Sequence, residues 1–195
     1  MRYPNLIAIC GKRRSGKDTI ADILCEQYGY MKVRIADPLK FVVGTLFGFS
    51  LEQMECDQKD ALDERWDISP RQAMQFIGTE VMQHKIQELL PDVGRKFWIR
   101  SFLSGIRGGD QNQKYVISDL RFLHEEEELR KHGVMIWKVI RPGHQHQHQH
   151  QHQNSEIDQH CSEKEWEEIC EDVLIINSGD VSDLQKSVSD AMPRL

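Results

Sequence analysis

The stretch that most constrains the fold is residues 7–22, IAICGKRRSGKDTIAD. An apolar run leads into a loop with two glycines, and a helical pattern follows, so the stretch predicts a buried strand, a tight loop and a helix in succession. The loop matches the phosphate-binding pattern G-x-x-x-x-G-K-[ST], except that Asp18 stands where the pattern has a hydroxyl residue. It is therefore either a phosphate loop that has lost its function or a variant of one.

The rest of the chain alternates short apolar runs with helical patterns. This alternation predicts an α/β fold with a parallel sheet and right-handed crossovers. A chain of 195 residues is expected to form one domain over 1–195. The predicted strands are 6–10, 33–36, 115–118, 135–140 and 173–176, and the predicted helices are 18–28, 38–46, 69–90, 96–106, 122–131 and 181–192.

Composition excludes some classes of partner. The chain is 39% hydrophobic and 29% charged, with a formal net charge of −6, which argues against bulk electrostatic binding to nucleic acid or to an anionic membrane. The apolar run near the N-terminus is too short for a membrane span. The five cysteines are scattered and include no C-x-x-C pair, which favours a reducing, cytoplasmic compartment.

The glycine-rich loop has the composition and the context of a phosphate site. Gly11 and Gly16 permit backbone conformations that other residues resist, so the N–H groups of the residues between them and the helix can converge on phosphate oxygens. Lys17 is placed to reach the β- and γ-phosphates of a nucleotide such as ATP. The residues expected to bind the phosphates are Gly11, Arg13, Arg14, Ser15, Gly16, Lys17, Asp18 and Thr19.

Asp18 need not disable this loop. A carboxylate is a hard oxygen ligand for Mg²⁺ and suits the first turn of a helix. Asp18 could therefore hold magnesium directly or through a water, while Thr19 supplies the hydroxyl group; the alternative is a plain acidic residue at a helix start.

The segment GKRRSGKDT resembles the loop of deoxynucleoside monophosphate kinases from phages and large DNA viruses, and that of animal phosphomevalonate kinases. In both families aspartate follows the lysine, so the resemblance makes Asp18 a family variant. It extends from about residue 5 to residue 190 and implies a P-loop kinase core: a five-stranded parallel sheet in order 2-3-1-4-5, helices on both faces and a mobile lid. It also implies ATP and Mg²⁺ as cofactors, a small-molecule substrate and, for a viral protein, the host cytoplasm. A homodimer is left open.

Two segments resemble the family's acceptor-binding elements. In ADPLKF (36–41), Lys40 would lie near the acceptor's phosphate, unless it is a solvated helix cation, and Asp37 could hold a magnesium-bound water. In RQAMQFIGTEVM (71–82), the side chains of Arg71, Gln75 and Thr79 share a helix face that suits a phosphate or a base edge. The alternative is an amphipathic helix with an exposed polar face. Phosphomevalonate kinases lack this second element.

Three strand ends supply further candidates. YVISDLR (115–121) resembles the family's S/T-D-x-R element, which would assign Arg121 to the acceptor phosphate, with Asp119 orienting that arginine or supporting the metal. No arginine occurs from 142 to 193. The negative charge of the transferring phosphoryl group would therefore be neutralised by other cations: Lys17, the loop arginines (Arg14 above all), Arg121 and Arg141. Asn177 either lies in a turn that contacts adenine or is an ordinary turn former.

Residues 144–153 read HQHQHQHQHQ. A polar two-residue repeat cannot bury a core and is expected to be a low-complexity insert in the lid region with incidental metal affinity. The predicted function is ATP-dependent phosphorylation of deoxynucleoside monophosphates to diphosphates. The alternatives are a phosphomevalonate kinase and a nucleotide-binding module without turnover.

Overall fold

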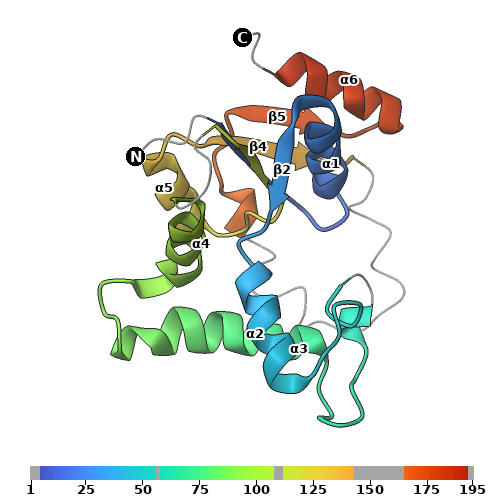
Figure 1. Ribbon diagram of the computed structural model, residues 1–195. Helices are drawn as coiled ribbons and strands as arrows, with labels where there is room; N and C mark the ends of the chain where they lie inside the picture. The colour runs from blue at the N-terminus through green and yellow to red at the C-terminus, as the bar shows by residue number, and fades with distance from the viewer. Residues whose placement is uncertain (1–4, 56–57, 108–111, 143–164, 193–195) are drawn as a thin grey trace. The chain divides into compact units, whose positions relative to one another are not determined.

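The computed structural model describes residues 5–55, 58–107, 112–142 and 165–192. The chain divides into two compact units (Figure 1): a sheet unit of residues 1–34 and 109–195, and a helical unit of residues 35–108. Each unit is described by itself, and one domain over 1–195 stays a prediction. The predicted lid and the tract at 144–153 fall outside the described residues.

The sheet unit contains one five-stranded sheet in the order β2-β3-β1-β4-β5, and every pair of neighbouring strands is parallel. The predicted P-loop kinase topology is therefore confirmed. The central strand β1 is buried along its whole length, as expected of a parallel strand covered on both faces. The strands are β1 (Leu6–Gly11), β2 (Tyr30–Val33), β3 (Lys114–Ile117), β4 (Met135–Ile140) and β5 (Val173–Ile176).

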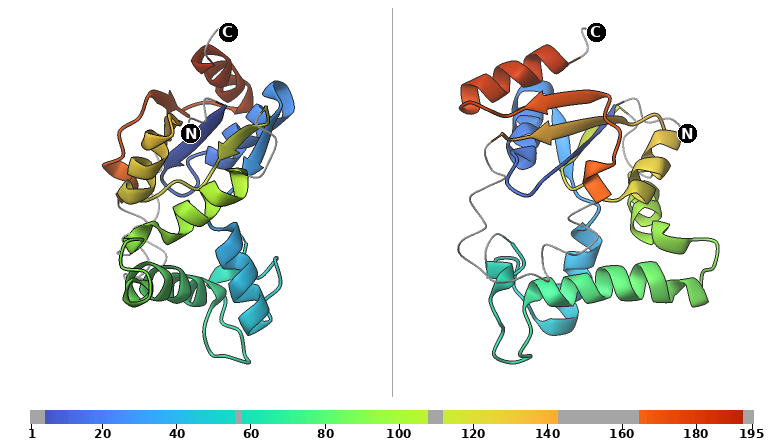
Figure 2. Two further views of the ribbon diagram at one scale, coloured as in Figure 1. Left: turned by 60° about the vertical axis from the view of Figure 1, so that its left-hand side comes forward. Right: turned by 180° about the vertical axis from the view of Figure 1, so that it is seen from behind.

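Helices lie on both faces of this sheet. Helices α1 (Lys17–Tyr28) and α6 (Val181–Ala191) pack together, and their apolar side chains form a core with those of the central strands. Helix α5 (Leu123–Lys131) lies on the opposite face (Figure 2). The right-handed crossover rule accounts for this: the β1–α1–β2 and β3–α5–β4 connections run in opposite directions along the sheet. A short 3₁₀ helix, η7 (Glu165–Glu167), precedes β5.

One predicted strand was wrong. Residues 34–36 of the predicted strand 33–36 do not pair, and β2 instead pairs Tyr30–Val33 with Lys114–Ile117 of β3. Because β2 is an edge strand, it tolerates the half-buried Lys32 and the exposed Met31. The strand was predicted at 33–36 because a continuous apolar run is typical of a buried parallel strand.

The helical unit contains α2 (Asp37–Phe47), η1 (Gln58–Asp60), α3 (Pro70–Gln75), η2 (Phe76–His84), η3 (Lys85–Glu88), η4 (Gly94–Lys96) and α4 (Phe97–Arg107). The helix predicted over 69–90 begins as expected, with the Ser69 hydroxyl accepting a hydrogen bond from the backbone N–H of Gln72 and proline in the first turn. It does not stay α-helical: it continues as the π-helix η2 and then as the 3₁₀ helix η3.

Close packing surrounds Gly78 in this π-helix. A Cβ atom at Gly78 would come within 2.6 Å of Leu39 Cδ2, so the glycine admits the side chain of α2. The buried indole of Trp98 donates a hydrogen bond of 2.8 Å to the Gly78 carbonyl oxygen. Helices α2, η2 and α4 are thus held together around one glycine.

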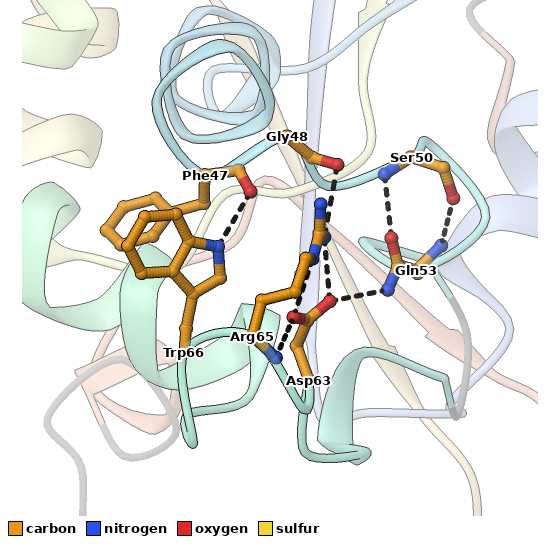
Figure 3. A network of polar contacts seen from close by, with 7 residues as sticks. All are labelled: Phe47, Gly48, Ser50, Gln53, Asp63, Arg65 and Trp66. Atoms are coloured by element: carbon orange, nitrogen blue, oxygen red, sulfur yellow. Dashed lines mark hydrogen bonds and ion pairs between the residues drawn. The ribbon is translucent and has the colours of Figure 1, made fainter.

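A network of hydrogen bonds and an ion pair connects residues at the end of α2 with residues of the segment between α2 and α3 (Figure 3). The Asp63 carboxylate accepts hydrogen bonds from the Arg65 side chain at 2.8 and 2.9 Å and from the Gln53 amide at 3.1 Å. Arg65 also reaches the Gly48 carbonyl, and the Trp66 indole donates to the Phe47 carbonyl at 2.9 Å. The hydrogen bonds from Arg65 lower the pKa of Asp63 to about 2, so this carboxylate stays charged across the physiological range.

We predict that Trp98→Phe destabilises the protein more than Trp137→Phe does. Both tryptophans are buried, but the Trp137 indole N–H has no hydrogen-bond partner among the described residues. The first change therefore loses a buried hydrogen bond and the second does not, a difference of about 1 kcal/mol in the free energy of unfolding. Urea unfolding of both variants measures it, and equal losses would contradict the assigned role of the Trp98 hydrogen bond.

Candidate active site

The carboxyl ends of the five parallel strands meet at one edge of the sheet unit. Gly11 ends β1, Arg34 follows β2, Asp119 lies just beyond β3, Arg141 follows β4 and Asn177 follows β5. Ligands of open α/β sheets bind outside this edge. Topology thus brings most of the predicted nucleotide-side residues to the same end of the sheet.

The glycine positions of the loop are set by close packing as well as by backbone angle. Gly11 has φ 145° and Gly16 has φ 107°, which side chains resist. A Cβ atom at Gly11 would overlap the Val139 carbonyl oxygen, and one at Gly16 would come within 2.5 Å of Asn177 Nδ2. The loop therefore lies against the ends of β4 and β5, and neither glycine can be replaced without moving it.

Asn177 ties the loop to the last strand. Its buried side-chain amide donates a hydrogen bond of 2.8 Å to the Ser15 carbonyl oxygen, while its backbone N–H donates to the Ile140 carbonyl at 2.8 Å. From the sequence, Asn177 was expected either in a turn that contacts adenine or as an ordinary turn former, and neither expectation includes this contact. No local pattern signals a hydrogen bond between residues 162 positions apart.

The loop gathers hydrogen-bond donors of the kind that bind phosphate groups. The Lys17 ammonium lies over the loop and donates to the carbonyl oxygens of Gly11 at 2.8 Å and Lys12 at 2.7 Å. The buried Ser15 hydroxyl has no hydrogen-bond partner among the described residues. Arg14 takes a left-handed conformation with φ 63°, and its side chain and that of Arg13 are exposed.

The Asp18 carboxylate lies among cations. Its Oδ1 atom is 2.9 Å from Lys32 Nζ and 3.6 Å from Arg34 Nη2. Burial by itself would raise the pKa of Asp18, but the hydrogen bond from Lys32 and the charges of Lys32, Arg34 and Lys17 outweigh it and hold the pKa below its usual value. Asp18 is thus an ionised, exposed oxygen donor beside the loop.

These residues fit Mg²⁺ in the manner usual for nucleotide enzymes. Magnesium there is held by one or two carboxylates together with substrate phosphates, and Asp18 is such a carboxylate, with Thr19 next to it. No cluster of three or more His, Cys, Asp or Glu side chains that could hold a metal was found in the described part of the chain. Asp119 follows β3, and Asp37 lies exposed in the first turn of α2.

The turn that carries Asp119 and Arg121 is organised by a buried carboxyl group. Glu125, in the first turn of α5, is 4% exposed and accepts hydrogen bonds of 3.1 Å from the backbone N–H groups of Arg121 and Phe122. Burial, and to a smaller extent the nearby Asp119 carboxylate, raise the pKa of Glu125 to about 8, although the two N–H groups act to lower it. Residues 125–128 read EEEE, a run typical of a solvated helix face, but Glu125 is buried.

The predicted acceptor residues of the helical unit carry acidic partners. Lys40 Nζ is 3.1 Å from Glu55 Oε1, so Lys40 is not a purely solvated cation. Arg71 is buried and its guanidinium is bonded to both carboxylate oxygens of Asp60. Thr79 is also buried and Gln75 half-buried, so the alternative of an exposed polar face is wrong.

We predict that the Glu125→Gln variant gains stability relative to the wild type as pH rises. The pKa of Glu125 moves from an ordinary 4.5 to about 8 on folding, so the protonated form favours the native state. Its contribution is complete below about pH 4.5 and is lost as pH rises toward 8. Urea unfolding at pH 5, 6.5 and 8 tests this. Glu127→Gln, on the same helix with a side chain 57% exposed, is the control; the same pH trend in both variants would contradict the prediction.

Comparisons with known proteins agree with this geometry. A family model described as Deoxynucleotide monophosphate kinase matches residues 5–58 and 48–188. The protein of Acanthamoeba polyphaga mimivirus named "Putative deoxynucleotide monophosphate kinase" is 28% identical over 190 residues, which cover 94% of this chain and 93% of the viral protein.

The fold is also found among solved structures. The structure of TT1252 from Thermus thermophilus aligns with 100% of this chain and 99% of its own, with a TM-score of 0.56 and 15% sequence identity, a likeness of fold alone.

No helix in the described ranges is long and apolar enough to cross a membrane. Since the family model spans most of the sequence, the chain belongs to the deoxynucleotide monophosphate kinase family.

Proposed function

We propose that the protein transfers the γ-phosphoryl group of ATP to a deoxynucleoside monophosphate, giving ADP and the deoxynucleoside diphosphate. The observation that carries the proposal is the phosphate loop, in which Lys17 lies over the loop carbonyls and Asn177 anchors Ser15. Membership of the family supports a phosphotransferase that acts on nucleotides. The free cysteines Cys10, Cys25 and Cys170 are in keeping with a cytoplasmic setting.

The proposed phosphoryl transfer requires no strong general base. The acceptor is a phosphate group whose second pKa is about 6, so it is largely dianionic at neutral pH. The protein's task is to align the two nucleotides and to offset the charge of mutually repelling phosphate groups. Cations around the transferring group therefore matter more than any proton acceptor.

The loop supplies the ATP side. The backbone N–H groups from Arg13 to Asp18 bind phosphate oxygens, and Lys17 moves from the loop carbonyls to the β- and γ-phosphates. Asp18, with Thr19 beside it, holds the magnesium ion, which when bound neutralises phosphate charge. Asp37 and Asp119 are further candidates for contact with that ion through water.

The acceptor side rests on cations whose partners are carboxylates. In this proposal Lys40 and Arg71 of the helical unit, held by Glu55 and Asp60, bind the acceptor together with Gln75 and Thr79. Arg14, Arg121 and Arg141 offset the charge of the phosphoryl group during transfer. The bidentate contact of Arg71 with Asp60 supports the use of this guanidinium for a planar or phosphate-like partner.

The test is ADP release with Mg-ATP and one acceptor at a time: dAMP, dCMP, dGMP, dTMP, their ribose counterparts and phosphomevalonate. Turnover on one or more deoxynucleotides supports the proposal. Turnover on phosphomevalonate alone would replace it with the related kinase reaction. ATP binding without turnover on any acceptor would leave a nucleotide-binding module.

We predict that Lys17→Ala lowers turnover by about 100-fold or more, the scale of one lost transition-state contact. Steady-state ADP release measures the effect, and circular dichroism checks the fold. Lys186→Ala is the control, because Lys186 is an exposed lysine on α6. If turnover of Lys17→Ala were close to that of the control, the assignment of Lys17 to the active site would be wrong.

A further inference from the structure

The turn after β3 presents one exposed cation between two buried apolar side chains. Leu120 and Phe122 are buried, whereas Arg121 between them is exposed. Packing of the two apolar neighbours restricts the course of the backbone on either side of Arg121. The turn lies at the edge of the sheet where ligands of open α/β folds bind. Arg121 is thus an exposed cation on an anchored turn.

Carboxyl groups accept the backbone N–H groups of three successive residues here. Oε2 of Glu125 accepts hydrogen bonds of 3.1 Å from the N–H groups of Arg121 and Phe122. Oε2 of Glu165 accepts one of 3.2 Å from the N–H group of Leu123. The bond from Phe122 is half of a capping box, in which a carboxyl group in the first turn of a helix accepts the N–H group of the residue that precedes the helix. The bond from Arg121 extends this cap into the turn itself.

These hydrogen bonds decide which groups of the turn can meet a phosphate. The N-terminus of a helix commonly binds anions through backbone N–H groups that no helical carbonyl accepts. At α5 the N–H groups of residues 121–123 are bonded to carboxyl oxygens of the chain. A phosphate group at this turn is therefore met by side chains, and Arg121 supplies the positive charge.

Glu125 is placed to act on Arg121 without touching a substrate. Its side chain is 4% exposed, and the groups that it accepts belong to the main chain. The direction in which the Arg121 side chain leaves the turn is set by the backbone at that residue. A change in that backbone would break the bond to Glu125 and redirect the guanidinium.

Resting on the proposed function, we propose that Glu125 is a positioning residue of the phosphoryl-transfer site, which fixes the backbone of Arg121 so that the guanidinium meets the phosphoryl group during transfer. Glu125 acts through Arg121 and contacts neither nucleotide. The functional residues of the sheet unit thus include a buried side chain in the first turn of α5.

The experiment compares Glu125→Met and Glu125→Gln with Glu126→Met. Methionine has about the length of glutamate but only a weak acceptor, whereas glutamine keeps a carbonyl oxygen for the two N–H groups. Glu126 is a matched control on the same helix. Its side chain is 14% exposed, and its carboxylate also accepts a backbone N–H group, that of Cys170 at 3.2 Å, in a different segment.

ADP release at pH 7 with Mg-ATP and dAMP, dCMP, dGMP or dTMP gives kcat, KM for ATP and KM for each acceptor. Calorimetric titration with ATP counts the binding sites, so that kcat is expressed per folded molecule. Arg121→Met, alone and combined with Glu125→Met, completes a double-mutant cycle.

Glu125→Met should lower kcat/KM for the acceptor by about tenfold or more while KM for ATP changes less than about twofold, as expected when a catalytic group is slightly displaced. Glu125→Gln should stay within about threefold of the wild type, because the acceptor oxygen is retained. Glu126→Met should match the wild type. The double variant should lose no more than Arg121→Met alone, because Glu125 acts through Arg121.

Three outcomes would overturn the inference. In the first, kcat/KM of Glu125→Met per ATP site stays close to the wild type, as a role in folding alone requires. In the second, Glu125→Gln loses as much as Glu125→Met. In the third, the losses of Glu125→Met and Arg121→Met add in the double variant. All three differ from failure of the proposed function, in which the wild-type protein itself releases no ADP with any deoxynucleotide.

Discussion

The hydrogen bond from the Asn177 amide to the Ser15 carbonyl is the contact on which the site depends. It joins the backbone of the phosphate loop at Ser15 to the end of the last strand. A buried carbonyl left without a donor costs about 1–3 kcal/mol, so the loop and strand β5 are stabilised as a pair. The same contact explains Gly16, because any side chain there would collide with Asn177.

Carboxylates accompany two of the cations assigned to phosphates. Glu55 contacts Lys40 and Asp60 contacts Arg71. A buried or half-buried cation is costly unless it is paired, and the acids provide that pairing when phosphate is absent. A dianionic substrate phosphate would compete with these carboxylates for Lys40 and Arg71. Such pairing keeps long side chains ordered before the substrate binds.

The sequence predicted those parts of the fold that depend on local pattern. Strands 135–140 and 173–176 match β4 and β5 because both are rich in apolar residues, although β5 is an edge strand with Leu174 and Ile176 exposed. The other edge strand, β2, was misplaced because its sequence, which includes Lys32, has no continuous apolar run. The change from α-helix to π-helix at Phe76 was also missed, since apolar periodicity alone does not reveal a shift in hydrogen-bond register. The Trp98 contact that accompanies it joins residues 20 positions apart.

The same division holds for the site. Gly11, Gly16 and Lys17 follow from a motif in which each position has its own physical reason, whereas the role of Asp18 depends on residues of another strand. Asp18 illustrates this limit: from the sequence it was expected to hold magnesium or to be a plain acidic residue at a helix start, and neither expectation includes its ion pairs with cations of another segment. Only the packing of α1 against β2 shows that the Asp18 carboxylate lies beside Lys32 and Arg34. An unusual residue in a familiar loop is therefore best explained by what the fold places opposite it.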